Sequence, residues 1–278
     1  MSSLENGIRI LQCFSAERSE LRVSEVAEHL GLPKSTVSRL MKTLAESGLI
    51  EPDPKRRGYG PGILAFELGN YFQKRLKLLD LVDEALSRLV DEYHATGYIG
   101  VLNGADIVLI RVRQGSYPVR LVLEPGYRGQ AFATTIGRVL MARLPDAEVR
   151  ALHPDPLSHP EAEYETDIDS LLSDLANIRR DGVAATFNTN FSGFCAIGCA
   201  VESADEPQAV AFSLSFPTSA ADDEIIKRMK KSMLVEACEI GRRVKDKYWQ
   251  EFRSVPEFDS KIVAVDGTRY TGRIGSIP

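Results

Sequence analysis

Residues 33–44 read PKSTVSRLMKTL, and this stretch decides how the first part of the chain is expected to fold. If a helix begins at Lys34, its apolar residues recur at spacings of three and four and share one face: Val37, Leu40, Met41 and Leu44. The opposite side carries hydroxyls and cations: Lys34, Ser35, Thr36, Ser38, Arg39, Lys42 and Thr43. Such a surface suits nucleic-acid phosphates and base edges, or it is the solvated face of an ordinary helix.

The preceding segment, VSEVAEHLGL (23–32), predicts a shorter helix with Ser24 as a candidate cap for its first turn. Gly31 then turns the chain. Ala27 lies four residues before Gly31 and Val37 six residues after it, which is the spacing of a helix-turn-helix. A small residue lets the two helices cross closely, and glycine supplies the backbone conformation of the turn. The second helix is also the cationic one, as a helix in the major groove would be.

The following segment, GLIEPDPKRRGYGPG (48–62), predicts a hairpin: a brief strand at Leu49 and Ile50, a polar turn, and a return strand through Tyr59. The turn carries three consecutive cations: Lys55, Arg56 and Arg57. A solvated basic loop is the alternative, but after a helix-turn-helix the hairpin is better explained as a wing. We expect the wing to contact the DNA backbone or minor groove while helix 34–47 reads base edges.

The charge of the chain limits any nucleic-acid site to this segment. The net charge is −5 over 278 residues, which disfavours a protein that coats nucleic acid through bulk charge. Between Lys34 and Gly62, however, six cations stand against three anions. The length suits a small domain followed by a larger one.

The composition argues against a membrane protein and against a metalloprotein. With 44% hydrophobic and 26% charged residues, and no apolar run long enough for a membrane helix, the sequence predicts a globular chain. No signal peptide is visible, so we expect the protein to stay in the cytoplasm and its four cysteines to be reduced. Cys195 and Cys199 form the only close pair and lack nearby histidines, so neither a metal nor another cofactor is expected.

The helix-turn-helix and wing segments resemble those of a known family. The run GIRILQCF followed by LRVSEVAEHLGLPKSTVSRLMKTLAESGLIEPDPKRRGYGPG is similar to the amino-terminal domain of the IclR family of bacterial transcriptional regulators. The family's wing usually ends in tyrosine, one or two residues, leucine and glycine; here Tyr59 and Gly62 are kept and Pro61 replaces the leucine. The resemblance implies a winged helix-turn-helix in residues 1–72.

Beyond the wing, residues 63–94 have a helical pattern, and we expect a linker helix over 73–95. GYIGVLN and DIVLIRV, joined at Asn103-Gly104, predict a β-hairpin, and a further strand is expected at 119–123. Helices are expected after Thr134 or Thr135, before Gly182, and over about 221–250. This order predicts an α+β domain over 96–252, an antiparallel sheet flanked by helices. The tail 253–278 has no predicted role.

Two late strands alternate small and bulky residues. In QAVAFSLSF (208–216) the small set is Ala209, Ala211, Ser213 and Ser215. In FCAIGCAV (194–201) it is Ala196, Gly198 and Ala200, with both cysteines on the bulky side, where thiols are commonly inert. The small residues leave room beside the sheet, either for a closely packed helix or for a ligand.

This second part also resembles the IclR family, whose second domain is a GAF-like effector-binding domain. The matching runs are AFATTIGRVLMARLP, LANIRRDGVAATFNTNFSGFCAIGCAVES and AVAFSLSFP. The resemblance implies effector contacts from Thr134, Thr135, Thr186, Ala196, Ser213 and Ser215. Where the family has a histidine, a pocket cysteine and an acidic pair, this chain has Phe132, Ala196, and Asn188 with Thr189. The predicted pocket, Asn188 included, is therefore less charged.

The residue types favour a small organic acid as the effector. A helix that opens at Thr134 presents free N–H groups, and the hydroxyls of Ser213 and Ser215 could bind the same anion. An aromatic acid also fits, because Phe132, Tyr127 and Phe194 could supply apolar walls.

Three functions follow from these features. The first is a ligand-controlled transcription factor, most simply a repressor, that acts as a dimer or tetramer because one recognition helix reads too little DNA. The second is an enzyme using the same pocket; against it, the sequence lacks the common catalytic motifs, and hydroxyls without a base are poor nucleophiles. The third, an architectural DNA binder, conflicts with the acidic net charge.

Overall fold

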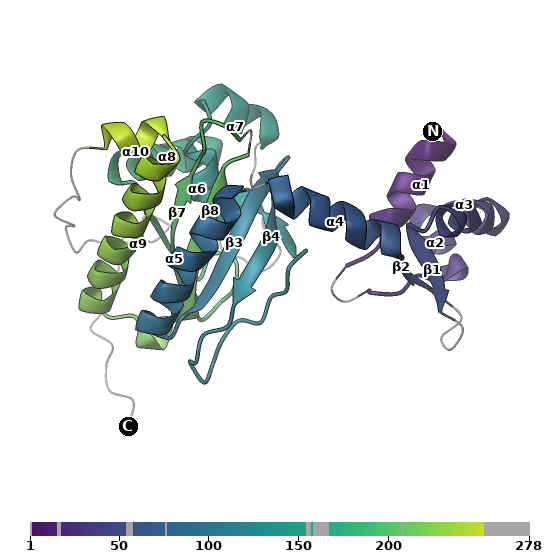
Figure 1. Cartoon of the computed structure of the whole chain (residues 1–278), viewed down its shortest axis with the longest axis horizontal. Coiled ribbons are helices and arrows are strands. Elements are labelled where there is room, and N and C mark those ends of the chain that lie inside the picture. The colour runs from purple at the N-terminus through teal and green to yellow at the C-terminus, as the bar shows by residue number, and fades with distance from the viewer. Residues whose placement is uncertain are drawn as a thin grey trace. The chain divides into compact units, whose positions relative to one another are not determined.

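The computed structural model describes residues 2–15, 18–53, 58–75, 77–153, 157, 167–206 and 208–252. Contacts within the chain divide it into two compact units, the first ending at Lys77 and the second beginning at Leu78 (Figure 1).

The first unit is the winged helix-turn-helix that the sequence predicted. Its elements are α1 (Ser3–Leu11), α2 (Val23–Leu30), α3 (Lys34–Glu46), β1 (Ile50–Asp53), β2 (Gly58–Pro61) and α4 (Ile63–Arg75). Gly31 ends α2 in the left-handed conformation, with φ of 65°, as the turn requires. β1 and β2 pair antiparallel, and Leu21 bridges to Tyr59. Val37 and Met41 of α3 are fully buried in the core of this unit.

One detail of α2 differs from the prediction. Ser24 does not cap the helix, because the helix already begins at Val23 and Ser24 lies inside its first turn. The N-cap position is occupied by Arg22, and no side chain caps the helix there.

The helical stretch after the wing is described as α4 and α5 (Lys77–Tyr93), with residue 76 between them outside the described residues. The expected linker helix 73–95 does not lie outside both domains, because residues 78–93 belong to the second unit. The reason is burial, since Leu79, Val82 and Leu86 of α5 are fully buried in that unit. The second unit thus starts earlier than the predicted residue 96.

The second unit is built on an antiparallel sheet with the order β5-β4-β3-β8-β7-β6 among the described residues. The strands are β3 (Thr96–Asn103), β4 (Asp106–Arg113), β5 (Arg128–Gln130), β6 (Ala184–Phe187), β7 (Phe194–Val201) and β8 (Val210–Pro217). The Asn103-Gly104 hairpin forms as predicted, with φ of 63° at Gly104. The strand expected at 119–123 is wrong. The neighbour of β4 is β5 instead, and the carbonyl of Leu121 accepts a hydrogen bond from the Tyr98 hydroxyl.

Helices cover both faces of this sheet. They are α5, α6 (Thr135–Met141), α7 (Asp146–Leu152), α8 (Ile168–Asp181), α9 (Asp223–Arg243) and α10 (Lys247–Glu251), with short 3-10 turns η1 (Ala131–Ala133) and η2 (Thr218–Ala220). The final helix expected over 221–250 is divided, because the chain leaves helical geometry at Lys245, where φ is 59°.

Two glycines show which helix lies on which face. A Cβ on Gly97 would lie 2.7 Å from Leu86 and Val90 of α5, whereas one on Gly198 would lie 3.0 Å from the Thr135 side chain of α6. Tyr98 is the strand partner of Ser213, and so is Gly198, so these three share the α6 face while Gly97 points the other way. The fold is an α+β architecture, as predicted.

Candidate functional site

The polar side of α3 is open to solvent. Lys34, Ser35, Ser38, Arg39, Lys42 and Thr43 are exposed, and Thr36 is half-buried. On the opposite side Val37, Leu40 and Met41 are buried, while Leu44 is half-buried, as the predicted apolar face requires. The helix therefore presents a contiguous row of donors whose backbone is fixed by the core of the first unit.

The contacts along this row leave its cations accessible. Lys42 lies 3.8 Å from Glu46, but both side chains are mostly in water, so the pair is weak. The Thr43 hydroxyl donates to the carbonyl of Arg39 at 3.2 Å. Within the described residues, the guanidinium of Arg39 forms no ion pair. The three cations predicted for the wing, Lys55, Arg56 and Arg57, lie outside the described residues.

The second unit contains a cavity between α6 and the sheet, with a volume of about 550 Å³ counting space open to solvent. Seven of the predicted effector residues line it: Thr134, Thr135, Thr186, Phe194, Ala196, Ser213 and Ser215. The alternatives left open by the small-residue faces are thus both realised, since Gly198 packs against α6 while the two serines face the cavity.

Asn188 is the predicted pocket residue that the structure does not bring to the cavity. It is exposed, with φ of 53°, and its side-chain oxygen accepts the N–H of Gly193 at 2.8 Å. Its role is to hold the turn before β7. Asn190, two residues later, lines the cavity instead. Phe132, expected as a wall, is buried with its ring edge-on to His153 and does not line the cavity.

Sequence reasoning missed much of the apolar lining: Tyr98, Ile107, Leu109, Leu121, Leu123, Ile136 and Phe191. These residues come from β3, β4, the coil before β5, α6 and the turn before β7, so no local pattern brings them together. Tyr127, which was expected, lies with its ring centroid 6.3 Å from that of Phe191. The alternation in β3 and β4 could have shown that the side chains of Tyr98, Ile107 and Leu109 lie on one face of the sheet. It could not have shown that this face borders a cavity.

The hydroxyls of the cavity divide into engaged and available groups. Thr134 caps α6 by accepting the N–H of Gly137 at 3.0 Å, and the Thr135 and Thr186 hydroxyls lie 2.5 Å apart. Within the described residues, the hydroxyls of Ser213 and Ser215 have no hydrogen-bond partner. Because α6 has only seven residues and Thr134 already occupies one of its first N–H groups, the serines are better placed than the helix end to bind a ligand.

The lining carries no charge of its own. None of the described residues around the cavity is Asp, Glu, His, Lys or Arg. Burial raises the pKa of the Tyr98 hydroxyl and raises the pKa of the Cys195 thiol to about 12, so both remain neutral near pH 7. A hydroxyl in this cavity therefore has no neighbouring base to activate it, and the arrangement suits binding rather than nucleophilic chemistry.

The described residues offer neither a metal site nor a membrane span. They contain no cluster of three or more histidine, cysteine or acidic side chains placed to hold a metal ion. None of the described helices is both long and apolar enough to cross a membrane.

The chain matches family models over both units. The IclR helix-turn-helix domain matches residues 3–54, and the model described as bacterial transcriptional regulator IclR C-terminal matches residues 72–242. The HTH-type transcriptional regulator XynR of Escherichia coli (strain K12) is 28% identical over 242 residues, covering 84% of this chain and 93% of XynR. The transcriptional repressor IclR of the same strain is 26% identical, covering 86% of this chain and 89% of the repressor.

A solved structure has the same fold. It is an IclR homolog complexed with 4-hydroxybenzoate from Microbacterium hydrocarbonoxydans, with a TM-score of 0.74 and 19% sequence identity. The alignment covers 87% of this chain and 100% of that chain.

Proposed function

The chain belongs to the IclR family of bacterial transcriptional regulators, and from this premise we propose that it is a repressor that binds operator DNA through α3 and responds to a small organic acid in the cavity. Its homologues are transcriptional regulators, and repressors are among them. We further propose that the cavity binds its ligand without chemical reaction, and that the protein acts in the cytoplasm, where a bacterial operator lies.

The observation that carries the DNA-binding proposal is the exposed polar row of α3. Arg39 and Lys42 project from a helix whose apolar side is fixed in the core, which is how a recognition helix presents side chains to the major groove. Lys34, Ser35, Thr36 and Ser38 would contact bases or phosphates near the start of the helix. On the sequence alone, we add the wing cations to this proposed surface as phosphate contacts: Lys55, Arg56 and Arg57.

The effector proposal rests on the available serines and the aromatic walls. A carboxylate bound by Ser213 and Ser215 would receive charge-assisted hydrogen bonds, which are stronger than neutral ones. Tyr127, Phe191 and Phe194 offer apolar surface for the body of the molecule. A hydroxylated aromatic acid combines both features, and the neighbouring structure with bound 4-hydroxybenzoate supports that chemical class.

We also propose that the regulator is a homo-oligomer. The first unit exposes large apolar side chains on α4, with Phe66 at 67% and Tyr71 at 66% exposed, and on α1, with Leu4 at 74%. Clustered exposed apolar residues mark association surfaces, and a second copy of this unit would also supply the second recognition helix that a two-fold operator needs.

One experiment tests the proposed function in two stages. The full-length protein is used to select DNA from a random pool, and the enriched sequence is titrated in gel shifts. A panel of organic acids that includes 4-hydroxybenzoate is then screened by thermal shift, and any stabilising acid is added to the DNA titration. Enrichment of a sequence with two related half-sites, and a change of affinity with an acid, are expected. Failure to enrich any sequence would refute the proposal.

A further inference from the structure

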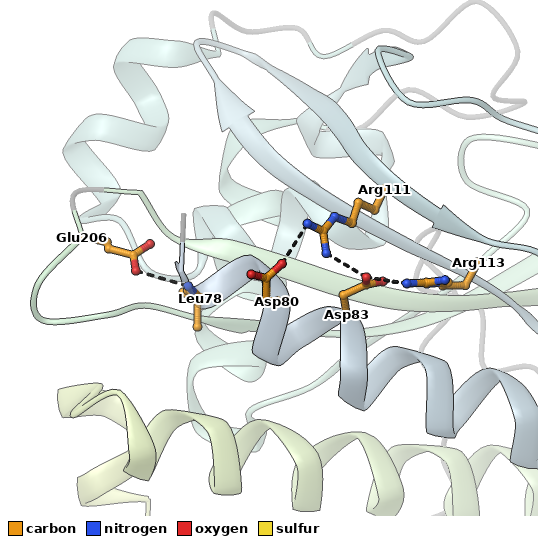
Figure 2. Close-up of polar contacts among 6 residues, drawn as sticks. All are labelled: Leu78, Asp80, Asp83, Arg111, Arg113 and Glu206. Atoms are coloured by element: carbon orange, nitrogen blue, oxygen red, sulfur yellow. Dashed lines mark hydrogen bonds and ion pairs between the residues drawn. The ribbon is translucent and has the colours of Figure 1, made fainter. Parts of the chain in front are cut away.

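The helix α5 occupies a particular position in the chain, because it directly follows α4 of the DNA-binding unit and opens the second unit. Figure 2 shows that polar side chains from two other parts of the second unit hold its first two turns. One set comes from β4 and the other from the loop before β8. β4 itself lines the cavity, and so does β8, the strand that follows this loop.

The first set centres on Asp83. Its carboxylate accepts from Arg111 Nη1 at 2.7 Å and from Arg113 Nε at 2.7 Å, and Arg111 also donates to Asp80 at 2.9 Å (Figure 2). The Asp83 side chain is only 9% exposed. A buried carboxylate held by two guanidinium groups fixes the distance between β4 and this turn of α5.

A bulge in β4 makes this contact possible. Ile107 and Leu109 line the cavity on the α6 face. The register pairs Gly100 with Leu109 but Ile99 with Arg111, so Ile110 is an extra residue and the strand alternation shifts after it. Arg111 and Arg113 therefore point to the α5 face instead of the α6 face. One strand contacts the cavity with its first half and α5 with its second.

The second set is a single capping contact from a distant loop. Glu206 Oε1 accepts the N–H of Leu78 at 3.2 Å, in the first turn of α5 (Figure 2). Glu206 lies four residues before the start of β8, the strand that carries Ser213 and Ser215. The first turn of α5 is thereby joined to a second cavity-lining strand.

The other end of α5 is held differently. Arg88 pairs with Glu236 at 2.7 Å, and the Tyr93 hydroxyl lies 2.8 Å from that of Ser232. Both partners belong to α9, which contributes no residue to the described lining of the cavity. The start of α5, next in sequence to the DNA-binding unit, is thus held by β4, which lines the cavity, and by the loop that leads into β8, which also lines it.

We propose that the start of α5 responds to occupancy of the cavity, with Asp83, Arg111, Arg113 and Glu206 as the positioning residues of that response; this rests on the proposed function. An occupant that displaces β4 or β8 shifts the partners of Asp83 and of the Leu78 N–H, and so favours a different geometry of residues 78–84. The covalent connection then carries this change toward α4. A ligand that binds one geometry better shifts the population toward it.

In the test, a substituted side chain fills the cavity in place of a ligand. Demonstrating coupling requires a perturbation at one site and a readout at the other. Ala196→Leu places a larger side chain in the cavity. Hydrogen exchange of the full-length protein is measured at residues 78–84 in wild type, Ala196→Leu, Asp83→Asn and the double variant. We expect Ala196→Leu to change exchange there at least about threefold, and Asp83→Asn to reduce that response to less than about 1.5-fold.

The matched control is Glu236→Gln, which removes the charge from the Arg88–Glu236 ion pair between α5 and α9 and should leave the response to Ala196→Leu intact. Exchange at β7 provides an internal check, since Ala196→Leu must alter it in every background. A response at β7 without one at residues 78–84, or an equal response with and without Asp83, would overturn the inference. If Ala196→Leu does not fold, the smaller change Ser215→Val replaces it.

A second readout separates this inference from the proposed function. Affinity for the DNA sequence selected by the wild type should change with Ala196→Leu, and the change should shrink in the Asp83→Asn background. If no DNA is selected but the exchange response holds, the proposed function fails and the role of α5 stands. If Ala196→Leu changes DNA affinity but not hydrogen exchange at residues 78–84, the inference about α5 is wrong while the proposed function stands.

Discussion

The proposed recognition surface on α3 and the cavity are built in opposite ways. The polar row of α3 comes from ten consecutive residues of one helix and lies in solvent. The cavity is lined by residues from five strands, η1, α6 and two irregular segments, between Tyr98 and Ser215. In the first unit the functional face and the core face are separate sides of one helix. In the second unit the functional face is part of the core.

This difference has a consequence for mutation. A side chain such as Arg39 can be removed without changing the packing of Val37 or Met41, so its loss should affect DNA binding alone. Around the cavity, a change at one residue affects the fold, the ligand, or both, depending on whether that residue faces α6 or the open space. Predictions that separate these cases test the comparison directly.

The largest expected effect is on the fold, at Gly198. A Cβ there would lie 3.0 Å from the Phe212 carbonyl and 3.0 Å from the Thr135 side chain, so Gly198→Val should lower the free energy of unfolding by about 3 kcal/mol through overpacking. Fluorescence of Trp249, the single tryptophan and a buried residue of the second unit, reports unfolding in urea. Gly69→Ala, where a Cβ meets open space, is the control. Equal stability of the two variants would show that α6 does not depend on the small face.

The next effect is on DNA affinity, at Arg39. If its guanidinium reads a base, Arg39→Ala should weaken binding to the selected DNA by about 2 kcal/mol, or roughly thirtyfold. The thermal midpoint of the protein should not change. Arg243→Ala removes an exposed arginine at the end of α9 and serves as the control. Gel shifts in which both variants bind like wild type would remove Arg39 from the recognition surface.

The same difference explains how much could be predicted from the sequence. The helix-turn-helix and wing follow from local signals: a 3.6-residue period, a left-handed glycine and a turn between short strands. Even there, a one-residue shift in the start of α2 was enough to make Ser24 the wrong cap.

The cavity was predictable only in part. The alternation of β7 and β8 identified Ala196, Ser213 and Ser215, and the resemblance to the family supplied the threonines. Asn188 was wrong because a turn with positive φ reversed which side chain points inward, and Asn190 took its place. The bulge at Ile110 likewise changes the direction of Arg111 and Arg113, and a strand period of two gives no sign of it. Long-range pairing decides such positions.

A smaller effect is expected on ligand affinity, at Ser215. Removing its hydroxyl should weaken binding of a carboxylate such as 4-hydroxybenzoate by about 1.5 kcal/mol, roughly tenfold, because a hydrogen bond to a charged group is lost. Calorimetry gives the affinity, and Trp249 fluorescence should show unchanged stability. DNA affinity without the acid should also stay the same. Normal affinity combined with easier unfolding would show that Ser215 contributes to packing rather than to ligand binding. The small residues of β7 and β8 would then all serve packing, as Gly198 does.

The smallest effect concerns pH and the buried charge of Asp83. Burial acts to raise the pKa of this carboxyl, but the hydrogen bonds and charges of Arg113 and Arg111 outweigh it, and the pKa lies below its ordinary value of 3.8. A carboxyl with a lowered folded-state pKa stabilises the fold at pH values above its unfolded-state pKa, and the contribution disappears as pH falls through the folded-state pKa.

At pH 7, therefore, Asp83→Asn should unfold more easily than wild type, by about 1 kcal/mol because both guanidinium groups remain partly in water. The difference should shrink below pH 4, as the wild-type carboxyl becomes protonated and resembles the amide. Urea midpoints from Trp249 fluorescence at pH 7 and pH 3 provide the measurement, with Ser215→Ala as a variant that removes no ionisable group. A difference that persists unchanged at pH 3 would mean that the shape of Asp83, rather than its charge, holds β4 to α5. In that case the contact between β4 and α5 would not depend on charge, whereas the proposed DNA contacts of the first unit do, and the contrast between the two units would be sharper.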